Sequence, residues 1–129
     1  MTLGKRKTMW PKLWIQGRDD VLLTLERWRG ATAQAWAYSV SHSQFLVRLY
    51  REEETKSDLR PSSLFLYLKG CDRVSFSDIW RSAKVQIEEK KGQFGPRFIV
   101  SDGERFSVDC LAVFAAESVE YLSLEDAGR

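Results

Sequence analysis

The segment that most constrains the fold is Arg97–Ala115, with the sequence RFIVSDGERFSVDCLAVFA. It contains two apolar runs of strand length, and the residues Ser101-Asp102-Gly103 between them are typical of a tight turn. The segment therefore predicts a β-hairpin, which describes a shape and supplies no chemistry.

The alternation of side chains decides between two connections for this hairpin. A two-residue Asp102-Gly103 turn sets Ile99 opposite Phe106. Phe98 and Val100 then lie on the polar face, so the apolar residues of the two strands no longer share one face. A three-residue loop of Ser101-Asp102-Gly103, with Gly103 in a left-handed conformation, keeps the pattern. We therefore predict the three-residue loop, with one apolar face made by Phe98, Val100, Phe106, Val108 and Cys110.

A second hairpin is predicted between Ala33 and Glu52, where apolar residues alternate in two runs. Pairing Val40 with Phe45 leaves Ser41–Gln44 as a four-residue connection. His42 then lies at the tip, and we expect an exposed turn residue because no nucleophile or acid partner stands beside it in the sequence. The predicted apolar face contains Trp36, Tyr38, Val40, Phe45, Val47 and Leu49.

Three further segments are assigned by their patterns. Leu64–Leu68 is apolar without alternation, which predicts a central strand covered on both faces. Lys84–Lys91 alternates, with Val85 and Ile87 inward and a charged outer face, as an edge strand does. Gly70–Ala83 is harder to interpret: we expect a short extended piece at Val74 and Phe76, then one helical turn capped by Ser77 and carrying Ile79 and Trp80.

The sequence predicts one helix, over Asp19–Arg29. Asp19 or Asp20 can cap its first turn, and Gly30 is placed to end it. Its apolar stripe is made by Val21, Leu22, Leu25 and Trp28.

These elements predict an α+β fold: one N-terminal amphipathic helix followed by a strongly curved, mostly antiparallel sheet of about six strands, a meander resembling a half-barrel. Six strands spaced about 4.8 Å apart make a sheet about 29 Å wide, whereas a helix about 10–12 Å wide covers two or three strands. Curvature or a second molecule must hide the rest. We expect a disordered basic leader over 1–9, one domain over 10–124 and a disordered tail over 125–129.

Charge and composition limit the functional classes. Five of the basic residues and no acid lie in residues 1–18, which leaves 15 basic against 18 acidic residues, a net charge of −3 for the rest. A mildly acidic body with a short basic arm makes nucleic-acid binding an unfavoured function. The sequence shows neither an apolar secretory core nor about 20 consecutive apolar residues, so we expect a cytoplasmic protein with no membrane partner.

No catalytic, metal or cofactor site is predicted. The two cysteines, Cys71 and Cys110, are expected to be free buried thiols, with a disulfide or a reactive Cys71 as alternatives. One histidine without metal-ligand spacing does not make a zinc site, and phosphate loops and paired carboxylates are not recognisable. We therefore expect a protein that is not an enzyme and binds no cofactor.

The resulting hypothesis is a non-catalytic protein-interaction or regulatory module, with a protein partner or self-association as a homodimer. Aromatic residues and arginine concentrate interface energy, and the candidate interface is Trp10, Trp14, Arg73, Trp80 and Arg81. Trp10 and Trp14 form an apolar patch around Pro11, which either packs on the domain or docks a partner.

The alternative hypothesis is a small apolar ligand in a pocket between sheet and helix. The candidate lining is Trp28, Trp36, Tyr38, Phe65 and Phe106. A cavity of roughly several hundred Å³ favours this alternative, whereas a filled interior with an exposed aromatic patch favours a protein partner.

Overall fold

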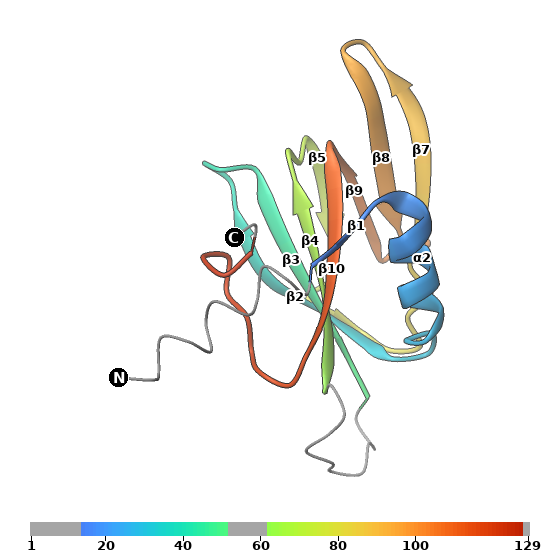
Figure 1. Ribbon diagram of the computed structural model, residues 1–129, viewed down its shortest axis with the longest axis vertical. Helices are drawn as coiled ribbons and strands as arrows, with labels where there is room; N and C mark the ends of the chain where they lie inside the picture. Colours follow the sequence, from blue (N-terminus) through green and yellow to red (C-terminus); the bar gives the residue numbers. More distant parts are fainter. Residues whose placement is uncertain (1–13, 52–61, 128–129) are drawn as a thin grey trace.

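A computed structural model describes residues 14–51 and 62–127 of the chain. The predicted leader, Trp10 and the charged connection 52–61 lie outside these residues. Two antiparallel sheets and the helix α2 (Arg18–Glu26) make up the described fold (Figure 1). The α+β class with mostly antiparallel strands is confirmed, but the strands form two sheets that do not close, instead of one meander.

The six-stranded sheet has the order β1-β10-β4-β3-β2-β6. Its strands are β1 (Ile15–Gln16), β10 (Ala112–Ser118), β4 (Ser63–Lys69), β3 (Gln44–Tyr50), β2 (Thr32–Ser39) and β6 (Ile79–Trp80). The four-stranded sheet has the order β5-β9-β8-β7. Its strands are β5 (Arg73–Phe76), β9 (Phe106–Cys110), β8 (Gly95–Ser101) and β7 (Gln86–Gly92).

The two sheets are joined through Leu111. β9 ends at Cys110 and β10 begins at Ala112, and the Leu111 N–H donates a hydrogen bond of 2.9 Å to the Lys69 carbonyl in the other sheet. The apolar run that reads as the second strand of one hairpin therefore serves both sheets, since a single residue carries the chain from one to the other.

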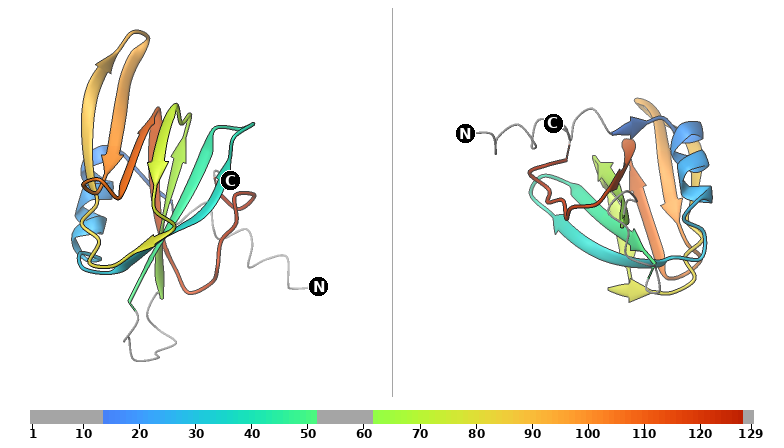
Figure 2. Two further views of the ribbon diagram at one scale, coloured as in Figure 1. Left: turned by 180° about the vertical axis from the view of Figure 1, so that it is seen from behind. Right: turned by 60° about the horizontal axis from the view of Figure 1, so that its bottom comes forward.

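The main core lies between the two sheets and is extended by α2, as the two views of Figure 2 show. Leu64, Leu66 and Leu68 of β4 face this core, and Phe65 and Tyr67 face the opposite side of the sheet. That outer side is covered by Trp14 and by the C-terminal segment, in which Leu122 and Ala127 are buried. The prediction that β4 is central and covered on both faces is confirmed.

The β8–β9 hairpin has the predicted apolar face but another loop. Gly103 is left-handed, with φ of 59°, as predicted. The register pairs Val100 with Val108 and the connection between β8 and β9 is 102–105, so the predicted loop of Ser101-Asp102-Gly103 is wrong. Asp102 stays beside β9, since its N–H donates 2.9 Å to the Phe106 carbonyl, and its carboxylate bonds Trp80 of β6. The predicted face survives since the register differs by an even number of residues: Phe98 packs against the core that contains Val100, Phe106, Val108 and Cys110.

The β2–β3 hairpin departs from its prediction because of a β-bulge at Trp36. Tyr38 pairs with Phe45, and the four-residue connection is 40–43 instead of 41–44. A bulge shifts the alternation by one residue, so Trp36 lies on the outer face while Tyr38 contacts Phe45 on the inner one. The predicted six-residue face is therefore wrong for Trp36, and for Val40, which lies exposed in the turn.

The helix α2 is shorter than predicted and has a different cap. Gly17, with φ of 105°, occupies the N-cap position, where no side chain caps the helix. Asp19 and Asp20 lie in the first turn and Trp28 lies in the turn that follows the helix. Leu23 is 65% exposed, so the helix is not clearly amphipathic. The helical turn predicted at Ile79 and Trp80 is wrong, because these residues form β6 beside β2.

Candidate protein-binding site

The predicted interface residues are divided between the interior and the surface. Trp80 is buried, stacks on Phe106 at 5.3 Å and donates a 2.8 Å hydrogen bond to Asp102. Trp14 packs edge-on against Tyr67 at 6.1 Å. Arg73 and Arg81 are exposed. Trp14 and Trp80 therefore stabilise the fold, and Arg73 and Arg81 lie at the surface.

The predicted pocket residues do not meet in one cavity. Trp28 and Phe106 belong to the main core, while Trp36 and Phe65 pack against each other at 6.0 Å on the outer face. Tyr38 is 42% exposed at the rim. The hollow beneath α2 that Trp28 lines measures about 10 Å³, which is about the room that one water molecule needs.

The residues between Arg73 and Arg81 connect the two sheets along one side of the molecule. After β5, the chain runs antiparallel beside β2: Ile79 pairs with Gln34, and the Ala35 N–H donates 2.8 Å to the Asp78 carbonyl. Farther along the same edge, the rings of Tyr38 and Phe76 are 6.0 Å apart. The 76–80 segment thus borders β2.

Four large apolar side chains are exposed on this border, and we name them the apolar edge: Tyr38, Val40, Phe76 and Ile79. Their exposed fractions are 42%, 74%, 38% and 52%. Nine large apolar side chains are exposed among the described residues, so this one border holds almost half of them. Tyr38 and Phe76 contact each other over the inner core, whereas Ile79, opposite Gln34, faces the outer side of the sheet. The border therefore offers apolar side chains on both of its faces, as an interaction surface can.

The aromatic members of the apolar edge are held in place by the core. Phe76 lies edge-to-face on Phe45 at 4.9 Å, and Tyr38 lies 5.3 Å from the same ring. Phe45 is fully buried and also contacts Phe106. Rings fixed in this way lose little conformational entropy when a partner covers them.

Backbone groups also face outward along this edge. The Ser77 N–H donates 2.8 Å to the Arg105 carbonyl, and hydrogen bonding alternates along an antiparallel pair. Phe76 therefore directs its N–H and C=O away from β9, and Ile79 directs its own away from β2, because Asp78 and Trp80 face that strand. These groups belong to the edges of different sheets, β5 and β6, so an extended segment of another protein could bond to either edge.

One buried carboxylate anchors the apolar edge. Asp102, 6% exposed, accepts hydrogen bonds of 2.8 Å from Trp80 Nε1 and 2.8 Å from the Lys84 N–H. Arg105 completes the group through an ion pair of 3.3 Å with the second oxygen. Sequence reasoning placed Asp102 in a turn and missed this role, since its partners are about 20 positions away in the chain.

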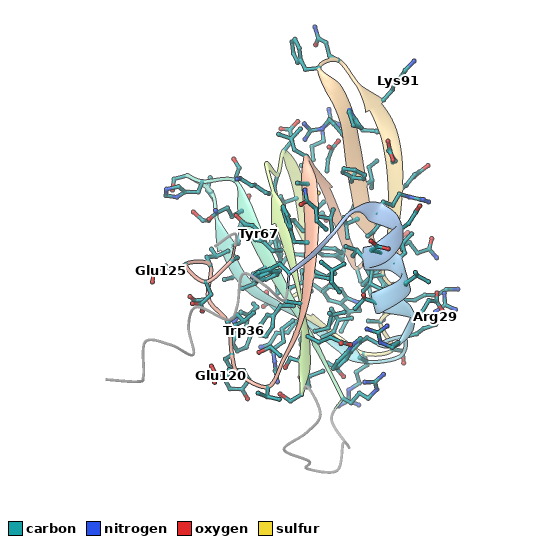
Figure 3. The ribbon with its side chains drawn as sticks, viewed as in Figure 1. Arg29, Trp36, Tyr67, Lys91, Glu120 and Glu125 are labelled. Atoms are coloured by element: carbon teal, nitrogen blue, oxygen red, sulfur yellow. The ribbon has the colours of Figure 1, made fainter. Side chains whose placement is uncertain are left out.

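A second aromatic cluster lies on the outer face of the six-stranded sheet. The guanidinium of Arg48 lies 4.2 Å from the ring centre of Tyr50, 4.8 Å from Tyr121 and 5.3 Å from Trp36. Its Nε donates 2.8 Å to Ser63 Oγ, and Trp36 Nε1 donates 2.7 Å to the Leu122 carbonyl. Figure 3 shows Trp36 beneath the C-terminal segment. Both polar groups are satisfied inside the chain, so this cluster holds the C-terminal segment to the sheet.

The nucleophile candidates are not activated. Cys71 and Cys110 are free thiols, and burial raises the pKa of Cys71 to about 11 and that of Cys110 to about 12. The hydroxyls of Ser39 and Ser41 lie 3.3 Å and 3.1 Å from His42 Nδ1, a pairing that the sequence analysis overlooked. All three groups share an exposed turn, where water competes for each of them.

Within 14–51 and 62–127, no three His, Cys, Asp or Glu residues gather where they could hold a metal ion. In the same residues, no helix is long and apolar enough to cross a membrane. Comparison with protein families, with curated proteins and with solved structures found nothing that matches this chain.

Proposed function

We propose that the chain is a non-catalytic protein-interaction module that binds an extended segment of a partner protein along the apolar edge. The observation that carries this proposal is the coincidence of four exposed apolar side chains with two strand edges, those of β5 and β6, on one border. Either feature alone is common, but together they match the requirements of strand addition.

The chemistry of the edge specifies the kind of segment. Backbone hydrogen bonds to Phe76 or to Ile79 supply affinity for any extended chain, and apolar side chains at alternate positions of the partner cover the exposed rings. Arg73 and Arg81 are exposed residues at the two ends of the 73–81 segment. Acidic residues flanking the apolar positions of the partner would complement them.

The alternative, a small apolar ligand, stays a prediction that the described interior does not favour. The hollow beneath α2 has about the volume of one water molecule, whereas ligand sites measure roughly 300–1,000 Å³.

The proposal is tested by selecting peptides of about ten residues from a random displayed library on the immobilised full chain. We expect enrichment of extended sequences with alternating apolar residues and acidic flanks. Ile79→Ser should weaken the binding of a selected peptide about tenfold, because it removes apolar contact area and leaves the backbone groups in place.

Val119→Ser is the matched control. Val119 is 57% exposed, close to the 52% of Ile79, and follows β10, four strands away from β6 in the same sheet. The proposal is overturned if no peptide is enriched, or if the two serine variants bind the selected peptide equally well.

A further inference from the structure

The opposite border of the molecule is the free edge of β7. β7 is the last strand of the four-stranded sheet and pairs with β8 alone in the described part of the chain. The β7–β8 hairpin projects past α2 and past the rest of the molecule (Figure 1). Its exposed residues Glu88, Glu89, Lys90 and Lys91 form what we name the charged edge.

The orientation of the backbone on this edge can be determined. Arg18 Nε donates 3.2 Å to the Ile87 carbonyl from outside the sheet, so Ile87 directs its N–H and C=O away from β8. Alternation places the same groups of Glu89 and Lys91 outward. The two-residue connection between Gly92 and Gly95 agrees, because the pair that closes such a hairpin is hydrogen-bonded within it.

A second copy of the chain can pair with this edge by strand addition about a two-fold axis. The two β7 strands are then antiparallel, and residues opposite each other must both face outward. Aligning Glu89 with Glu89 of the second copy places like charges together and uses Ile87, whose carbonyl is already bound by Arg18. Aligning Lys91 with Lys91 of the second copy again opposes like charges.

The remaining register has complementary charges. We propose that two copies of this chain form a dimer through β7, with Glu89 of each copy opposite Lys91 of the other. The N–H and C=O groups of these residues make four hydrogen bonds across the interface. Lys90 lies at the two-fold axis, opposite Lys90 of the second copy and on the other face of the sheet, where Asp109 compensates its charge at 2.9 Å.

The position of Phe94 supports the same register. Phe94 lies at the tip of the hairpin and is 95% exposed, an unfavourable state for a phenyl ring. When Glu89 lies opposite Lys91, Phe94 of the second copy reaches the level of Gln86, where Arg18 of α2 meets β7. The dimer therefore covers a ring that the single chain leaves in water. Figure 3 shows the side chain of Lys91 extending from the same projecting part of the hairpin.

The charged edge makes this dimer selective and weak. Charged residues on an edge strand normally prevent unwanted pairing. Here Lys91 opposes the register that aligns Lys91 with itself, and Glu89 opposes the register that aligns Glu89 with itself. Four backbone hydrogen bonds and one phenyl ring per copy make an interface smaller than that of a permanent dimer, so we expect a dissociation constant on the order of 100 μM.

The test is sedimentation velocity over a concentration series that reaches about 1 mM, with the full chain and with charge-reversed variants. Glu89→Lys and Lys91→Glu should each weaken self-association at least about tenfold, because each creates two like-charged pairs across the interface. A mixture of the two variants should form a heterodimer, since both pairs between positions 89 and 91 then have opposite charges again.

Glu88→Lys and Lys84→Glu are the matched controls. They change the net charge as the test variants do, but Glu88 faces Gly92 of the second copy in the proposed register and Lys84 lies before β7. Each should dimerise as the wild type does. A wild-type chain that stays monomeric at about 1 mM overturns the dimer. Test variants that dimerise like the controls overturn the edge, and a mixture without a heterodimer overturns the register.

Discussion

The apolar edge and the charged edge are both borders of antiparallel sheets, but they offer different kinds of recognition. The apolar edge presents rings and aliphatic side chains, which any extended apolar segment can cover. The charged edge presents two acids followed by two bases, of which Glu89 and Lys91 lie opposite each other in the proposed antiparallel dimer. Covering the apolar side chains of the apolar edge would therefore contribute mainly to affinity for a partner. The order of acidic and basic residues along the charged edge would contribute mainly to the choice of partner and register.

The two edges are also anchored in a parallel way. Both anchors are aspartates on the β8–β9 hairpin or its connection: Asp102 holds the chain at Trp80 and Lys84, and Asp109 holds the projecting hairpin at Lys90 and Arg97. The hairpin that dominates the sequence pattern thus positions both proposed surfaces, and the two can be disturbed separately.

The largest effect is expected for Asp102→Ala, which disrupts the anchor of the apolar edge. The substitution leaves the Trp80 Nε1 donor and the Lys84 N–H without their acceptor in a buried place, so the free energy of unfolding should fall by about 3 kcal/mol. Urea denaturation followed by tryptophan fluorescence measures it. The exposed neighbour Glu104→Ala should change it by less than about 0.5 kcal/mol, and an equal loss in both would refute the role of Asp102.

A smaller, pH-dependent effect is expected for Asp109→Asn, which disrupts the anchor of the charged edge. Burial raises the pKa of Asp109, but hydrogen bonds from Lys90 and Arg97 outweigh it and hold the pKa below its ordinary value. A carboxyl whose pKa is lowered by folding stabilises the protein above its unfolded pKa, about 3.9, and loses this contribution as the pH falls through the folded value.

Asp109→Asn should therefore lower the free energy of unfolding by about 1–2 kcal/mol at neutral pH. The difference from the wild type should shrink in acid, below the unfolded pKa. Urea titrations of both proteins at neutral and acidic pH measure this, and a difference that is the same at both would contradict the ion-pair assignment.

The smallest effect is expected for Arg18→Met, which sharpens the boundary of the charged edge. Arg18 is partly exposed and donates one hydrogen bond to the Ile87 carbonyl, so its loss should cost about 0.5–1 kcal/mol of unfolding free energy. Dimerisation through Glu89 and Lys91 should persist, because neither residue contacts Arg18. Arg29→Met is the control, and loss of the dimer in Arg18→Met alone would place the interface nearer to α2 than we infer.

The sequence was most informative where local alternation decides the structure. The unbroken run at Leu64–Leu68 identified a central strand, and Val85 and Ile87 identified an edge strand, because each pattern depends on burial alone. The apolar face of the β8–β9 hairpin was also predictable, since the predicted and observed registers differ by an even number of residues, which keeps each side chain on the same face.

The errors arose where a distant partner overrides the local pattern. The bulge at Trp36 depends on how β2 meets β3, and the strand at Ile79 and Trp80 exists because β2 offers an edge. Asp102 and its partners come together only in the folded chain. Of the candidate interface, Arg73 and Arg81 lie beside the proposed site, whereas Trp14 and Trp80 proved to be packed: a tryptophan count cannot distinguish a contact within the chain from one between chains.

The bulge at Trp36 has a consequence for how the chain tolerates changes in length. The extra residue shifts the alternation of side chains by one position. Ala35 before the bulge and Tyr38 after it therefore both point inward, although they are three positions apart in the sequence. We expect that removing one residue at the bulge would leave regular pairing on both sides of it. A deletion elsewhere in β2 would instead move the side chains beyond it to the opposite face of the sheet. Length variation in this strand should therefore be tolerated at one position only.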